Sequence, residues 1–173
     1  QMADSNLDLD SYIDWIILNA CGATSDNMSG KNIAVLKIGG QKWKFMAWDE
    51  DILYQAGNLQ ADHLRFYSAV NASDFYEFQP PVWYSGGPWT FTWSWNNILH
   101  SLMQNAEFTA RFRQRANSLI DGVFSTAAVH ARIDSVAILQ QPEWENHHDR
   151  WGGSSNWYGY HVVTFKSFVA SRT

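Results

Sequence analysis

The pattern of apolar and polar residues near the start of the chain predicts a helix. The apolar run at residues 15–18 follows a capping-box pattern that begins at Ser11. This pattern predicts a helix over about residues 9–20, ending near Gly22. The stretch 24–32 that follows is polar and contains glycine, which is typical of a loop.

A β-hairpin is predicted next. Residues 33–38 and 41–48 are two β-prone runs, and they are separated by the glycine pair Gly39-Gly40. Two such runs around a glycine pair predict strands joined by a two-residue primed turn.

The predicted turn also sets a register for the two strands. It places Leu36 opposite Trp43 and Ala34 opposite Phe45, so that apolar residues share one face. The alternate positions on the other face are three lysines, Lys37, Lys42 and Lys44.

The second half of the chain predicts several helices. Apolar residues recur at helical spacing from Trp95 onward. Asn105 and Ser125 are predicted to be the N-caps of two of these helices, and a last helix is expected from about Tyr160. Residues 52–95 are aromatic and rich in loop-forming residues, with no sustained period. The expected fold class is therefore α+β, with one β-hairpin followed by a mainly helical C-terminal part.

Composition and charge exclude some classes of function. The 173 residues are 46% hydrophobic, so the chain can form a folded domain rather than a disordered one. The net charge of -5 leaves no excess positive charge to release phosphate counterions, so we expect no nucleic-acid partner. No apolar run approaches the length of a membrane span, and the single cysteine forms no intrachain disulfide.

Acidic and amide side chains gather at the open end of the predicted hairpin, where the first strand begins and the second strand ends. The register places Asn32 opposite Ala47 and Asp49 diagonal to Asn32 on the same face, with Cβ atoms about 7–8 Å apart. Asp51 shares that face if the chain stays extended, and Asp26 enters from the preceding loop. Such residues are also common as turn formers or on a solvated rim, so this structural interpretation stays open.

This arrangement suits a hard divalent cation. Mg²⁺ prefers oxygen ligands and is typically held by one or two carboxylates together with substrate phosphates. Protein kinases have a catalytic-loop aspartate, then a metal-binding asparagine, then, after a short hairpin, a metal-binding aspartate. Asp26, Asn32 and Asp49 follow that order.

Several stretches of the sequence resemble the CotH kinase family, named for a spore coat protein. The resemblance runs in order over most of residues 10–172. It rests on five stretches: Asp26-Asn27 to Lys31-Asn32, Lys42-Trp43-Lys44-Phe45, Trp48-Asp49-Glu50-Asp51, Asn105-Ala106-Glu107-Phe108 with Arg111-Phe112-Arg113, and Asp149-Arg150-Trp151-Gly152.

The resemblance implies an atypical protein-kinase-like fold that transfers a phosphoryl group from ATP to Ser or Thr of a protein partner, using Mg²⁺ or Mn²⁺. It implies that Asp26 is the catalytic-loop aspartate and Asp49 the metal-binding aspartate. Asp51 matches the last acidic position of the family's Trp-Asp-x-Asp motif, Asn32 matches as a metal ligand, and Lys31 is implied to contact phosphate.

The chain also departs from the family. The nucleotide-gripping Arg-Gly-Asn-Ser-type segment is not found, so residues 1–173 are expected to be a partial domain, the catalytic-loop half of the large lobe, without the N-terminal lobe. We expect little or no phosphotransfer from this segment alone. The family resemblance suggests a bacterial protein that is extracytoplasmic or associated with the spore coat.

A rival hypothesis comes from the aromatic stretch at residues 83–95, where tryptophans alternate as on a sugar-stacking platform. The chain would then be an extracellular carbohydrate-binding module that uses Trp93, or a glycosidase fragment with Asp49 and Glu77 as its carboxylate pair.

Overall fold

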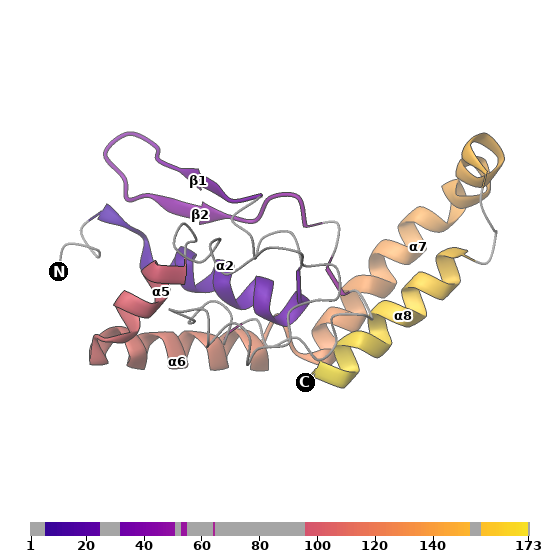
Figure 1. Cartoon of the computed structure of the whole chain (residues 1–173). Helices are drawn as coiled ribbons and strands as arrows, with labels where there is room; N and C mark the ends of the chain where they lie inside the picture. Colours follow the sequence, from indigo (N-terminus) through magenta and orange to yellow (C-terminus); the bar gives the residue numbers. More distant parts are fainter. Residues whose placement is uncertain are drawn as a thin grey trace, which may run out of the picture.

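The computed structural model describes residues 6–24, 32–50, 53, 54, 64, 96–152 and 157–172. In this part of the chain one two-stranded antiparallel hairpin is preceded by a helix and followed by four more, which confirms the α+β class (Figure 1). The elements are α2 (Leu9–Gly22), β1 (Ala34–Leu36), β2 (Lys44–Met46), α5 (Asn96–Met103), α6 (Ala106–Asp121), α7 (Thr126–Trp151) and α8 (Trp157–Arg172).

Helix α2 is confirmed over the predicted range, but its cap lies earlier than the sequence pattern indicates. The N-cap is Asp8, whose side chain accepts a hydrogen bond from the backbone N–H of Ser11 at 3.1 Å. The helix ends at Ala23, which has a left-handed backbone with φ 49° and donates its N–H to Asn19.

The core forms around α2, which lies between the hairpin and α6 (Figure 1). Phe45 of β2 is 7% exposed, and its ring centroid lies 4.8 Å from that of Tyr12 and 5.4 Å from that of Trp15. Phe108 and Phe112 of α6 pack into the same cluster. Aromatic side chains from three elements therefore fix the hairpin and α6 onto one central helix.

The turn of the hairpin lies where the sequence predicts it, but it is not a primed turn. Gln41 donates its N–H to the Ile38 carbonyl at 2.9 Å, so the two glycines are the central residues. Of these, only Gly40 has a positive φ, at 70°. A positive φ confined to the second central position is the type II pattern rather than I′ or II′.

The predicted register is wrong by one residue. The observed pairs are Ala34 with Met46, Val35 with Phe45 and Leu36 with Lys44. One extra residue lies between the turn and β2, as in a β-bulge. A one-residue shift moves side chains to the other face of a strand.

The shift changes which side chains of β1 point inward. Val35 packs beside Phe45 against the core, whereas Leu36 is 44% exposed on the outward face. Phe45 lies inward and Lys44 outward, as predicted. The outward face of the hairpin is therefore more apolar than predicted, because Leu36 and Met46 share it with Lys44.

Residues before α2 cover the outer edge of β2. Asp8 donates its N–H to the Trp43 carbonyl and Trp43 donates its N–H to the Asn6 carbonyl, both at 2.8 Å. The backbone N–H of Phe45 donates to Ser11 Oγ at 3.1 Å. These bonds fix the hairpin to the start of α2.

The helical second half follows the predicted caps. Asn105 and Ser125 are the N-caps of α6 and α7, and α8 begins at Trp157, slightly before the predicted start. Helices α7 and α8 form an antiparallel pair that extends away from the rest of the molecule (Figure 1). Lys166 of α8 contacts the Asp134 carboxylate of α7 at 2.8 and 2.9 Å.

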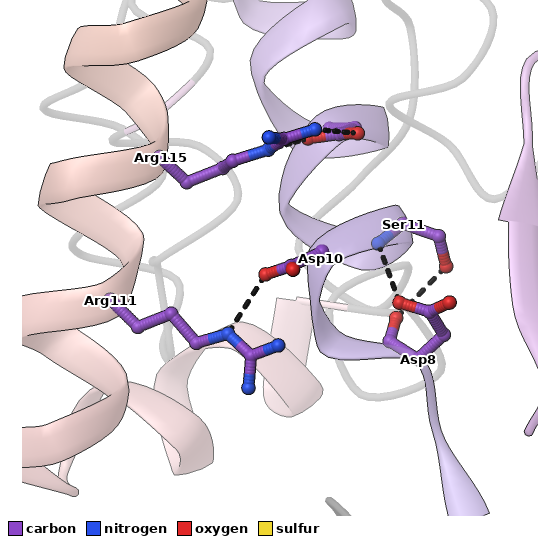
Figure 2. A network of polar contacts seen from close by, with 6 residues as sticks. Asp8, Asp10, Ser11, Arg111 and Arg115 are labelled. Carbon is purple, nitrogen blue, oxygen red and sulfur yellow. Dashed lines mark hydrogen bonds and ion pairs between the residues drawn. The ribbon is translucent and has the colours of Figure 1, made fainter.

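Two ion pairs join α2 to α6 (Figure 2). Arg111 Nε donates to Asp10 at 2.8 Å, and Arg115 donates from Nε and Nη2 to Asp14 at 2.7 and 2.8 Å. The two aspartates are four positions apart on α2, and the two arginines are four positions apart on α6. The charged side chains of each helix therefore lie along one of its faces. The pairs align the two helices that carry the core.

The Asp10 pair predicts a specific dependence of stability on pH. The hydrogen bond from Arg111 holds the pKa of Asp10 below its ordinary value. A carboxyl whose pKa is lower in the folded state stabilises the fold above its unfolded pKa, and this stabilisation is lost as pH falls below about 4 through the folded value.

Asp10→Asn is therefore expected to lower the free energy of unfolding at pH 7 by about 0.5–1 kcal/mol, because the 48% exposed side chain is screened by solvent. The difference from wild type should shrink between pH 7 and about pH 2, as Asp10 becomes protonated in the folded state as well. Urea unfolding at both pH values measures it, with the exposed Glu145→Gln as the control. A difference that persists at low pH would contradict this assignment.

Candidate functional site

Two of the predicted site residues stand at the open end of the hairpin. Asn32 comes just before β1, and Asp49 comes just after β2. The last cross-strand pair at this end is Ala34 with Met46, so the two chains leave the sheet beside each other. The hairpin therefore brings an amide and a carboxylate to the same end of the sheet.

Both residues have a left-handed backbone. The φ angle is 54° at Asn32 and 55° at Asp49. Apart from glycine, asparagine and aspartate adopt this region most readily, and such conformations are concentrated at functional sites. The chain thus bends away from the strand direction at both positions.

The predicted diagonal relation between Asn32 and Asp49 is wrong in its geometry. It assumed Asn32 opposite Ala47, but the observed register, continued outward, places Asn32 opposite Trp48. Asp49 also lacks the extended backbone on which the predicted diagonal relation depended. What remains is the shared open end of the hairpin, where both residues have a left-handed backbone.

A third segment of the site begins at the same end of the molecule. Helix α2 ends beside the open end of the hairpin (Figure 1), and Thr24 after it is fully buried. Asp26 follows Thr24 by two residues in the sequence. The chain after Asp49 returns to this point, because Tyr54 donates its N–H to the Gly22 carbonyl at 2.8 Å.

Three predicted site residues, Asp26, Lys31 and Asp51, lie outside the described residues, so their roles stay predictions. Within the described ranges no group of three or more His, Cys, Asp or Glu residues is placed to hold a metal ion. The oxygen donors at the described end of the hairpin, the Asn32 amide and the Asp49 carboxylate, are of the kind that Mg²⁺ prefers.

Tyr54 anchors the segment that follows the acidic motif. Its ring centroid lies 6.1 Å from that of Phe165 and 5.7 Å from that of Phe168, both on α8. Leu53 covers Gly22, where an added Cβ would clash with the leucine side chain. Tyr54 could not be predicted as part of the site, because it lies in a stretch without periodicity and carries no local signal.

Glu50, the residue after Asp49, has one buried carboxylate oxygen. Burial raises the pKa of the nearby Tyr54 phenol, and the Cys21 and Glu50 side chains raise it further when they are ionised. Glu50 is itself half-buried. The middle residue of the Trp-Asp-x-Asp motif therefore faces the interior beside Tyr54, while Asp49 is exposed.

A mainly apolar cavity of about 210 Å³ adjoins this region. It is lined by residues from α2, α7 and α8 and includes Cys21, Tyr54 and Arg172. Burial raises the pKa of the Cys21 thiol, which therefore stays protonated at neutral pH. Arg172 donates to the Ala20 carbonyl at 2.7 Å and so ties the end of α8 to α2.

The rival carbohydrate site has no described counterpart. Glu77 and Trp93 both lie outside the described residues, as does the whole aromatic stretch 83–95. The rival hypothesis stays a prediction.

Comparison with protein-family models places the chain in a family of kinases, with residues 3–173 matched. The family is described as CotH kinase protein, and the chain belongs to it. This confirms the resemblance seen in the sequence. The searches of curated proteins and of solved structures found no match.

The described part of the chain contains helices α2, α5, α6, α7 and α8. Among them, none combines the length and the apolar character that crossing a membrane requires.

Proposed function

We propose that this chain forms the catalytic-loop and metal-binding part of a protein kinase that transfers the γ-phosphoryl group of ATP to a Ser or Thr hydroxyl of a protein. Membership of the CotH kinase protein family supports the kinase class. The observation that carries the residue assignment is the convergence of the chain after α2, the start of β1 and the end of β2 at one end of the hairpin.

Each proposed residue has a distinct task. Asp26 orients the acceptor hydroxyl and accepts its proton as the oxygen attacks the γ-phosphorus and the bond to the ADP oxygen breaks. Asp49 and Asn32, with Asp51, hold Mg²⁺ or Mn²⁺, and Lys31 contacts a phosphate. A divalent ion held by these residues would supply neutralisation of the charge on the ATP phosphates.

The described contacts explain how this chain would keep the ligands in place. Phe45 fixes β2 to α2, and the Ser11 hydroxyl accepts from the Phe45 backbone. On the far side of Asp49, Tyr54 is held by the end of α2 and by α8. Asp49 thus lies between two anchored points, which limits its freedom before the metal binds.

Isothermal titration of the full chain with ATP tests this proposal. Saturable binding is expected with Mg²⁺ present and is expected to weaken by at least about tenfold when EDTA replaces the metal. Retention on insoluble polysaccharide, lost in Trp93→Ala and not accompanied by ATP binding, would favour the carbohydrate-binding hypothesis and contradict the kinase assignment.

The chain alone is expected to transfer phosphate slowly or not at all, because it lacks the family's nucleotide-gripping segment. Incubation with γ-labelled ATP and a mixture of candidate acceptor proteins measures this. Turnover at a rate typical of protein kinases, about 1–100 s⁻¹, would show that the segment is not required.

A further inference from the structure

The hairpin has one strand edge whose backbone groups point away from the sheet. Val35 is paired with Phe45, and the Phe45 N–H donates to Ser11 Oγ on the side away from β1. In an antiparallel ladder both residues of such a pair direct their N–H and C=O groups outward. The N–H and C=O of Val35 therefore point off the outer edge of β1.

The two edges of the sheet differ. The outer edge of β2 is bonded to residues 6–11, through Asn6, Asp8 and Ser11. Within the described residues β1 pairs with β2 alone. The β1 edge is thus the side of the sheet on which another extended chain can pair.

Apolar side chains are exposed on the outward face of the same hairpin. Leu36 is 44% and Met46 41% exposed, and beside them Ile38 and Trp48 are 59% and 62% exposed. We call these four residues the hairpin patch. A group of large apolar side chains exposed on one element is typical of an interaction surface.

The hairpin itself carries only positive charges, although the chain as a whole carries -5. Lys37, Lys42 and Lys44 lie on it, and no Asp or Glu occurs between Asp26 and Asp49. Lys44 pairs with Asp8 at 3.7 Å and Lys42 lies near Asp10, whereas Lys37 is the lysine that directly follows β1. The Lys37 ammonium lies over the Trp43 ring, 5.5 Å from its centroid. A partner with acidic side chains is therefore favoured over a basic one.

We propose that an extended, acidic and partly apolar segment of a protein partner binds here, adding a strand to the β1 edge. Its backbone would pair with Val35, its apolar side chains would contact the hairpin patch, and its carboxylates would approach the lysines. Docking by this route does not depend on phosphotransfer by the chain.

Two alternative occupants fit less well. An anionic lipid surface offers no row of backbone N–H and C=O groups to pair with Val35. A second copy of the chain would bring its own Lys37 to the same edge, and like charges on paired strands are unfavourable. Both alternatives are outcomes of the test below.

The test uses the full chain and a short fluorescent peptide of alternating glutamate and valine, with fluorescence anisotropy as the readout. Saturable binding is expected. Lys37→Glu should weaken it by about tenfold or more, because the variant places a carboxylate at the paired edge. Arg113→Glu makes the same charge change on the exposed surface of α6, so it should alter binding by less than about twofold.

A modified peptide separates strand addition from charge attraction without changing the protein. Methylation of alternate backbone nitrogens removes the N–H donors and should abolish binding. Equal binding of the methylated peptide, or no saturable binding of the unmodified one, would overturn the proposal. Binding to phosphatidylserine vesicles without peptide binding, or self-association that Lys37→Glu strengthens, would also overturn it.

Discussion

Asp49→Asn is expected to weaken ATP-dependent Mn²⁺ binding by about a hundredfold, which corresponds to about 2.7 kcal/mol. The substitution removes a charged oxygen ligand and keeps the size of the side chain. Asparagine also tolerates the left-handed backbone at this position, where φ is 55°, so the fold should not change. Titration of free Mn²⁺ by electron paramagnetic resonance, with and without ATP, measures the effect.

Asp26→Asn is the matched control for Asp49→Asn, because both variants lose one carboxylate from the proposed site. If Asp26 acts on the acceptor hydroxyl, this variant should bind Mn²⁺ and ATP within about twofold of wild type. Equal losses in the two variants would contradict the separate roles. An unchanged affinity in Asp49→Asn would remove that residue from the metal site.

Phe45→Ala is expected to destabilise the protein by about 3–5 kcal/mol. Phe45 is 7% exposed and contacts Tyr12 and Trp15, so its removal leaves a cavity between β2 and α2. A loss of this size is a large part of the roughly 5–15 kcal/mol available to a domain. Chemical denaturation followed by tryptophan fluorescence measures the free energy of unfolding.

Met46→Ala provides the control for this result. Met46 is the next residue on the same strand, but it lies on the outward face and is 41% exposed. Its replacement should cost less than about 1 kcal/mol. Similar losses for Phe45→Ala and Met46→Ala would mean that the observed register does not hold in solution.

The helices could be predicted from the sequence because their signals are local. The caps Asn105 and Ser125 each satisfy an N–H of the following turn, and the structure confirms both. The hairpin register could not be obtained in this way. The glycine pair determines where the chain reverses, but not how many residues lie between the turn and β2. The extra residue there accompanies long-range hydrogen bonds that Trp43 and Phe45 make with residues 6–11.

The site was predictable in composition more than in geometry. The order Asp26, Asn32, Asp49 is visible in the sequence, and the structure confirms a hairpin between Asn32 and Asp49. The roles of the three residues stay predictions. The left-handed backbone at Asn32 and Asp49 carries no sequence signal beyond the residue types themselves. Tyr54 could not be found, because its contacts come from α8, more than a hundred residues later.

The pairing of α2 with α6 is a long-range feature that the sequence pattern does indicate. Asp10 and Asp14 are spaced by four residues on one helix, and Arg111 and Arg115 by four on another. Matching spacings of opposite charge predict that the two helices pair side by side. The structure shows this pairing as the two ion pairs of Figure 2.

Paramagnetic broadening of the backbone amide signals by Mn²⁺ in the presence of ATP locates the metal in the folded chain. The proposed function predicts that the strongest broadening is centred on Asn32 and Asp49, at the open end of the hairpin, with little effect at the Gly39-Gly40 turn or along α7. Broadening centred on another element, such as α7, would contradict the proposed site.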